Sequence, residues 1–129
     1  MYCIKADAQG PGWLHQIASF DRDTVMKHAD SIPNLESLIE VEKTRCLTFD
    51  TLFSETAIRH VDFLQIDAEG LDAEILRLFD IPRRKPAIVR FEHKHLRGED
   101  LGRSLALLRD QGYSIAICGG DVLAYHPMY

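Results

Sequence analysis

The sequence has few cysteines, no long apolar run and no excess of basic residues, and each of these absences excludes a class of protein. The three cysteines, Cys3, Cys46 and Cys118, are far apart and form no CxxC pair, which excludes a disulfide framework and a cysteine-rich zinc site. No segment approaches the roughly 18 apolar residues of a membrane-spanning helix, and residues 1–7 contain no stretch typical of a signal peptide. Scattered thiols are typical of a reducing compartment. We therefore expect a soluble, cytoplasmic protein with no membrane partner.

The charge balance is acidic, with 15 lysines and arginines against 20 aspartates and glutamates, a formal net charge of −5 at pH 7. Arg83-Arg84-Lys85 is a short basic cluster that we interpret as a solvated loop. The general basic surface of a nucleic-acid-binding protein is lacking, so we expect no nucleic-acid partner. A length of 129 residues suits one core of roughly 100–150 residues. We predict a single domain over residues 1–129.

The spacing of apolar residues predicts alternating strands and helices from residue 61 onward. Strands are expected over 61–66, 87–91 and 113–117, and amphipathic helices near 71–79 and 101–108. Gly112 is expected to close the second helix. Gly119-Gly120-Asp121 then turns the chain into a last strand, 122–125, as a hairpin. Because strands joined through helices are usually parallel, this order predicts an α/β fold: a mostly parallel sheet with flanking helices and an antiparallel C-terminal hairpin.

Before residue 61 the pattern is less regular. A short helix is expected over residues 22–28, with Asp21 as its N-cap, and another after Thr48, which is also a suitable N-cap residue. Between them, apolar and charged residues alternate from Ile39 to Leu47. This alternation predicts a strand that lies at the edge of a sheet.

Two clusters of polar residues follow directly after two of the predicted strands. Asp67-Ala68-Glu69-Gly70 follows strand 61–66, and Glu92-His93-Lys94-His95 follows strand 87–91. In open α/β sheets, ligands bind beyond the carboxyl ends of the strands. Neighbouring parallel strands would place the two clusters about 5–10 Å apart. We therefore expect Asp67 to face a ligand, and either His93 or His95 to accept a proton.

The same residues also have other interpretations. Glu69 and Asp72 can simply favour the positive N-terminal end of the following helix, and Gly70 can be present for its backbone geometry alone. If residues 92–95 are extended, His93 and His95 point to the same side, so a metal site with Asp67, as in a metal-dependent hydrolase, is geometrically possible. Two histidines and one aspartate without a fixed spacing to a further ligand are not a specific metal pattern. We therefore predict no metal.

The segment 61–70 resembles the signature of the FkbM-type methyltransferases, which use S-adenosylmethionine (SAM). The family's pattern is an apolar residue, Asp, two apolar residues, usually Lys, then Ile, Asp, a small residue, Glu and Gly, with a Glu four residues further on in a helix. Here Glu74 is that last residue, and Gln65 stands where Lys is usual. The next family strand ends in Glu, as Phe91-Glu92 does.

The resemblance implies a Rossmann-like, class I SAM-methyltransferase fold and O-methylation of a hydroxyl on a sugar or other secondary metabolite. It implies SAM as cofactor, bound near Asp67, Glu69 and Gly70, and a small-molecule or glycan acceptor oriented by Glu92. Methyl transfer needs the methyl and the acceptor oxygen in line and a group that takes the hydroxyl proton. Asp67 would lie near the transferring methyl, and His93 or His95 would be the base.

The resemblance covers one side of such a domain. Upstream of residue 61 we recognise no glycine-rich strand–turn–helix for the methionine part of SAM, because Gly10-Pro11-Gly12 has proline at its centre. We therefore interpret the chain as a partial Rossmann-like domain, the C-terminal, acceptor-side half. Two functions follow: a methyltransferase domain that can be inactive as this chain alone, or a non-catalytic α/β remnant that acts as an interaction module. Strand 61–66 would lack its usual partner, so we expect a homodimer through this exposed sheet edge.

Overall fold

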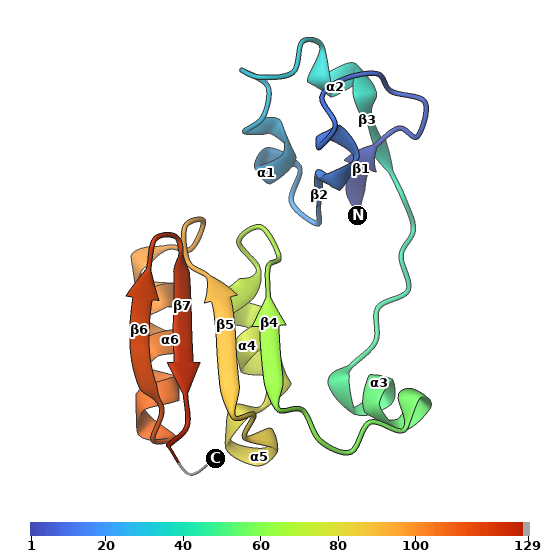
Figure 1. Ribbon diagram of the computed structural model, residues 1–129. Helices are drawn as coiled ribbons and strands as arrows, with labels where there is room; N and C mark the ends of the chain where they lie inside the picture. The colour runs from blue at the N-terminus through green and yellow to red at the C-terminus, as the bar shows by residue number, and fades with distance from the viewer. Residues whose placement is uncertain (128–129) are drawn as a thin grey trace. The chain divides into compact units, whose positions relative to one another are not determined.

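The structure is a computed structural model that describes residues 1–127. The chain forms two compact units, unit 1 over residues 1–46 and unit 2 from Leu47 onward (Figure 1). Each has its own sheet and its own hydrophobic core. The single domain expected over residues 1–129 stays a prediction. Among the described residues, no helix combines the length and the apolar character that crossing a bilayer requires.

Unit 1 contains a small antiparallel sheet in the order β2-β1-β3. Its strands are β1 (Tyr2–Ile4), β2 (Ala18–Ser19) and β3 (Ile39–Val41). The strand expected from Ile39 to Leu47 is thus much shorter, and it pairs with β1. Three short helices cover the sheet: the 3-10 turn η1 (Leu14–Gln16), α1 (Arg22–Met26) and α2 (Leu35–Leu38).

The core of unit 1 is small, and local hydrogen bonds define its helix ends. Buried aliphatic side chains from the strand, the turns and the helices pack together, among them Ile4, Leu14, Val25, Ile32 and Leu35. At the start of α1, the carboxylate of Asp21 accepts a hydrogen bond from the backbone N–H of Asp23 at 3.1 Å. This confirms the N-cap predicted from the sequence, because a carboxylate there satisfies a free N–H of the first turn.

Unit 2 contains a four-stranded sheet in the order β4-β5-β7-β6. Its strands are β4 (Phe63–Ile66), β5 (Ile88–Glu92), β6 (Ser114–Cys118) and β7 (Asp121–Tyr125). Helices α4 (Asp72–Phe79) and α6 (Gly98–Asp110) lie on one face of this sheet (Figure 1). The shorter helices are α3 (Phe49–Thr56), which precedes β4, and α5 (Ile81–Arg84), which follows α4.

The expectation of a mostly parallel sheet is wrong. Within residues 1–127, the one parallel pair is β4 with β5, whereas β7 is antiparallel to both of its neighbours. The reason is the position of the C-terminal hairpin, whose second strand, β7, pairs with β5. The hairpin turns at Gly119-Gly120, where Gly119 has a φ of +61°. A turn this short can join only antiparallel strands. Because β7 then occupies the place beside β5, strands β5 and β6 do not pair. The α/β class and the C-terminal hairpin are confirmed.

The two faces of this sheet differ in burial. Alternate side chains of β5 and β7 point towards the helices and are fully buried, as Val89, Phe91, Val122 and Ala124 are. They pack against Leu76 and Phe79 of α4 and Leu108 of α6. Residues on the opposite face remain exposed, and several of them are large and apolar: Phe63, Ile88, Leu123 and Tyr125.

Helix α3 packs against the end of α4. It begins after Thr48, whose hydroxyl accepts a hydrogen bond from the N–H of Thr51 at 3.1 Å, as the sequence predicted. The rings of Phe49 and Phe53 meet Phe79 edge-on, with centroids 5.1 and 6.2 Å apart. Edge-to-face aromatic pairs stabilise such contacts beyond the area they bury. Polar contacts add to this docking, because the Asp50 carboxylate binds the guanidinium groups of Arg83 at 2.5 Å and Arg84 at 2.7 Å.

Candidate functional site

The two polar clusters meet at the carboxyl ends of the parallel strands β4 and β5. Ile66, the last residue of β4, pairs with Phe91 of β5, so the loops after both strands begin side by side. We call this end of the sheet the rim. It comprises the loop from Asp67 to Leu71 and the segment from Glu92 to Leu96. The expected meeting of the two clusters is therefore confirmed.

The first loop is a tight turn that Gly70 makes possible. Glu69 has a φ of +49° and Gly70 a φ of +101°, and L side chains rarely adopt the second of these values. The N–H of Gly70 donates a hydrogen bond to Oδ2 of Asp72 at 3.2 Å. A Cβ atom on Gly70 would lie 3.6 Å from both Cβ and the carbonyl oxygen of His95. The turn thus brings the first loop into contact with the second.

Three side chains converge across these loops. Nε2 of His95 lies 3.6 Å from Oε2 of Glu69 and 3.6 Å from Oε2 of Glu92. These separations are too long for hydrogen bonds and within the range of ion pairs, which exist only when the imidazole is protonated. The side chains of His95 and Glu92 are 29% and 21% exposed, so both are partly shielded from water. Burial raises the pKa of Glu92, and the negative charges of Asp67 and Glu69 raise it further. His95 and Lys94 act in the opposite direction and lower this pKa, but the net shift is upward.

His93 does not join this group. Its Nε2 lies 3.2 Å from the carbonyl oxygen of Gly119, and its backbone N–H donates to the carbonyl oxygen of Gly120 at 2.8 Å. A carbonyl oxygen only accepts hydrogen bonds, so Nε2 of His93 must be the donor. His93 therefore fastens the end of β5 to the β6–β7 turn.

The segment after β5 is a turn and not an extended strand, which corrects one assumption of the sequence analysis. The N–H of Leu96 donates to the carbonyl oxygen of His93 at 3.0 Å. His93 and His95 therefore do not share a side, and the hypothetical metal set of Asp67, His93 and His95 does not form. Within residues 1–127, the set of three with metal-like spacing is Glu69, Glu92 and His95. Glu92 and His95 are three residues apart in the sequence, and a turn brings residues at this spacing together. This spacing is the signal in the sequence that would have identified the set.

Asp67 and Asp72 lie on either side of the turn after β4, and they differ in their exposure to solvent. Asp67 is exposed, with its side chain outside the core. Asp72 is 1% exposed at the start of α4. One of its oxygens binds the N–H of Gly70, while the other, Oδ1, has no hydrogen-bond partner within residues 1–127. The burial of Asp72 was not predicted from the sequence, because an acidic residue at a helix start is usually exposed.

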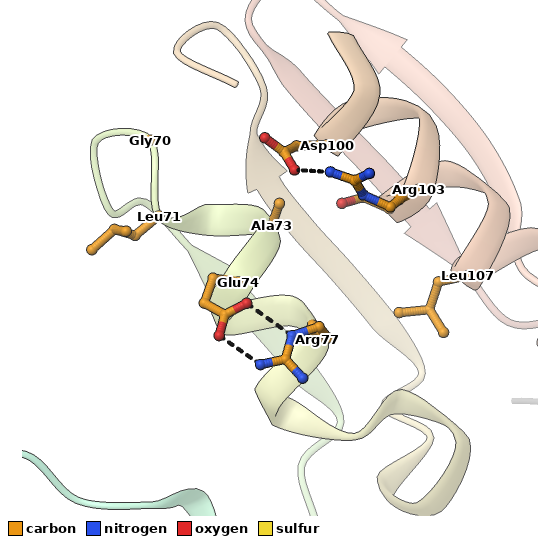
Figure 2. A pocket seen from close by; sticks show the side chains of 9 residues that line it. Gly70, Leu71, Ala73, Glu74, Arg77, Asp100, Arg103 and Leu107 are labelled. Atoms are coloured by element: carbon orange, nitrogen blue, oxygen red, sulfur yellow. Dashed lines mark hydrogen bonds and ion pairs between the residues drawn. The ribbon is translucent and has the colours of Figure 1, made fainter. Parts of the chain in front are cut away.

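A pocket of about 610 Å³ lies between α4 and α6 (Figure 2). Gly70 of the rim is one of its lining residues. The charged side chains that line the pocket are already paired with one another. Glu74 binds Arg77 through two contacts of 2.6 and 2.8 Å, and Asp100 binds Arg103 at 2.7 Å. The guanidinium of Arg77 holds the pKa of Glu74 below its usual value. Glu74, the helix residue of the motif, thus has an ion-pair partner in this pocket.

Comparison with known families identifies the chain. The model of the methyltransferase FkbM domain matches residues 8–115, which include both loops of the rim. Comparisons with curated proteins and with solved structures gave no match. The match spans most of the chain, and the residues that resemble the family signature form the turn beside His95. The chain belongs to the methyltransferase FkbM domain family.

Proposed function

We propose that this chain is the acceptor-side half of a SAM-dependent methyltransferase that transfers a methyl group to a hydroxyl of a sugar or other secondary metabolite. The observation that supports this most is the convergence of Glu69, Glu92 and His95 at the carboxyl ends of β4 and β5, where ligands of open α/β sheets bind. In this proposal the sheet of unit 2 is part of a Rossmann-like, class I methyltransferase sheet, and the protein works in the cytoplasm.

The rim fits one part of SAM. The sulfonium and the α-amino group of SAM are positive, and the exposed Asp67 and the half-exposed Glu69 offer carboxylates to these charges. Gly70 allows close approach of the backbone, because it has no side chain. When bound, SAM supplies the electrophilic methyl group. We recognise no glycine-rich turn for its methionine part in residues 1–60, so we propose that this chain alone binds SAM weakly.

The two histidines receive different roles in this proposal. His95 is the proton acceptor for the hydroxyl, because Glu69 and Glu92 lie 3.6 Å from its Nε2 and would stabilise the imidazolium that forms. His93 uses its Nε2 on the Gly119 carbonyl oxygen and positions the loop. Glu92 orients the acceptor.

Calorimetry with SAM, followed by methyl transfer, tests the proposal. The chain should bind SAM with micromolar or weaker affinity, and Asp67→Asn should reduce that affinity. Addition of a separately expressed SAM-binding half should then restore transfer of labelled methyl to a panel of sugar and small-molecule hydroxyl acceptors. A chain that binds no SAM, alone or with that half, would contradict the proposal.

A second candidate function is that of a non-catalytic interaction module. The observation that favours it is the open face of the unit 2 sheet, where Phe63 and Tyr125 are each 52% exposed and Ile88 and Leu123 add further apolar surface. Contiguous exposed apolar surface commonly marks an interaction site. Failure of all methyl transfer, together with specific self-association, would favour this function.

A further inference from the structure

We propose that Glu69, Glu92 and His95 form a binding site for one divalent transition-metal ion, with Zn²⁺ as the expected ion. The ligands come from the two loops that follow the parallel strands β4 and β5. The site lies on the rim of the proposed methyltransferase, but the binding of the ion does not rest on methyl transfer.

The spacing of the three groups suits a common ion. Zinc lies about 2.0–2.2 Å from imidazole nitrogen and carboxylate oxygen. Two ligands at about 2.1 Å and 3.6 Å apart subtend an angle of about 118° at the ion, near the tetrahedral value. Nε2 of His95 has this separation from both carboxylates. An ion between these groups would therefore need little movement of His95.

The third separation, between the two carboxylates, is at most 4.8 Å. Two ligands that each lie about 2.1 Å from one ion are about 3.4 Å apart at a tetrahedral angle, so this pair would close by at most about 1.4 Å. Glu69 can make that adjustment, because its side chain is 41% exposed and glutamate has three rotatable bonds. A movement of the Glu69 side chain would therefore complete the site.

The local charge favours a cation. The carboxylates of Asp67, Glu69 and Glu92 lie on the two loops of the rim, with oxygens of Glu69 and Glu92 within 4.8 Å of each other, so their negative charges repel one another. A divalent ion would remove this repulsion. An independent observation lies in the same loop, where the buried Asp72 has an oxygen without a hydrogen-bond partner among residues 1–127. The other oxygen of Asp72 accepts a hydrogen bond from the N–H of Gly70, the residue next to Glu69.

The donor set selects the kind of ion. Mg²⁺ and Ca²⁺ prefer sites made entirely of oxygen, whereas one imidazole with two carboxylates suits Zn²⁺ or Mn²⁺. Three protein ligands leave at least one coordination position open, as in catalytic zinc sites. An oxygen of water or of a bound molecule would fill that position.

Metal binding also has a consequence for methyl transfer, and this consequence rests on the proposed function. An ion on Nε2 uses the lone pair that His95 needs to accept a proton. The two roles of His95 therefore exclude each other. Bound Zn²⁺ is expected to inhibit methyl transfer if His95 is the base, and a chelator should reverse this.

Titration calorimetry with Zn²⁺ on the chelator-treated full chain tests the site. We expect one ion per chain, with affinity reduced at least tenfold in His95→Gln and in Glu92→Gln. The matched controls are His15→Gln, at an exposed histidine of unit 1, and Glu74→Gln, whose carboxylate pairs with Arg77. Both should bind Zn²⁺ as the wild type does. Absence of binding, or equal loss in the controls, would overturn the proposal.

Two further measurements make each outcome decisive. The absorption spectrum with Co²⁺ should show d–d bands without a thiolate charge-transfer band, because Cys3, Cys46 and Cys118 are free thiols that can also bind metal. A thiolate band would overturn the assignment. Circular dichroism checks the fold of each variant, and the more exposed Glu69→Gln replaces any variant that does not fold. Neither measurement involves SAM, so a failure here leaves the methyltransferase proposal untouched.

Discussion

Asp67 directly follows β4 and Glu92 is the last residue of β5. Asp67 is exposed, whereas the side chain of Glu92 is only 21% exposed. Because Asp67 lies outside the core, Asp67→Asn should leave the fold intact. In the presence of the SAM-binding half, we expect it to reduce methyl transfer at least about tenfold. Steady-state kinetics with labelled SAM, together with thermal unfolding of the same preparation, measures both effects. Activity close to that of the wild type would remove Asp67 from the mechanism.

The two histidines of the rim should respond differently to substitution. His95→Ala is expected to reduce kcat, because the imidazole at the two carboxylates is lost. His93→Ala removes the contact with the Gly119 carbonyl oxygen and is expected to have a smaller effect. Kinetics at saturating SAM compare the two variants. Equal small losses from both would show that neither histidine accepts the proton.

Glu92 gives a pH dependence of stability with a definite sign. Its folded pKa is raised, first by burial and then by Asp67 and Glu69. The stability it contributes is therefore present below the unfolded pKa and is lost as the pH rises through the folded pKa. Glu92→Gln should unfold at a higher temperature than the wild type near pH 7, by a small margin, and the difference should vanish near pH 4.

Glu74 provides the opposite control for that experiment. Arg77 lowers its pKa, so its contribution is present at neutral pH and is lost as the pH falls through the folded pKa. Glu74→Gln should therefore be no more stable than the wild type at pH 7. Thermal unfolding in chelator, from pH 4 to pH 8, measures both variants. The same sign for both would contradict the electrostatic account of the rim.

At the scale of elements, Phe79 connects α4 with α3. It is 1% exposed and meets the rings of Phe49 and Phe53. Phe79→Ala should lower the free energy of unfolding by about 3–5 kcal/mol, the usual cost of removing a buried phenyl ring. The control is Leu78→Ala in the same helix, at a side chain 53% exposed, with an expected change within about 0.5 kcal/mol. Urea denaturation measures both, and a small effect at Phe79 would mean that α3 is not docked there.

Local sequence patterns predicted the elements of unit 2 better than their arrangement. Three features depend only on neighbouring residues: helix α4, strand β5 and the end of α6 at Gly112, which has a φ of +85°. Periodicity and turn chemistry are therefore enough to predict them. The place of β7 between β5 and β6 depends on long-range pairing, which periodicity does not encode. The sequence predicted which two loops form the site. It did not predict which side chains converge there, because this depends on the turn that begins at His93.

At the scale of the whole molecule, β4 lies at an edge of its sheet. It pairs with β5 on one side, and no strand within residues 1–127 pairs with it on the other. The edge strand predicted from Ile39 onward pairs with β1 in unit 1. β4 itself contains three apolar residues and Gln65, without the lysine or proline that usually protects an exposed edge.

We therefore propose that two copies of this chain associate through β4. Unpaired N–H and C=O groups of an apolar edge favour pairing with a second chain, and pairing of identical edges gives a closed, two-fold dimer. Phe63, 52% exposed at the start of β4, would lie within that contact, so Phe63→Lys should return the protein to a monomer.

The control is Ile117→Lys on β6, the opposite edge strand, at a side chain 55% exposed. Light scattering at micromolar concentration should give twice 14.7 kDa for the wild type and for Ile117→Lys. A wild-type particle of 14.7 kDa would contradict the dimer, and dissociation by Ile117→Lys alone would move the contact to β6.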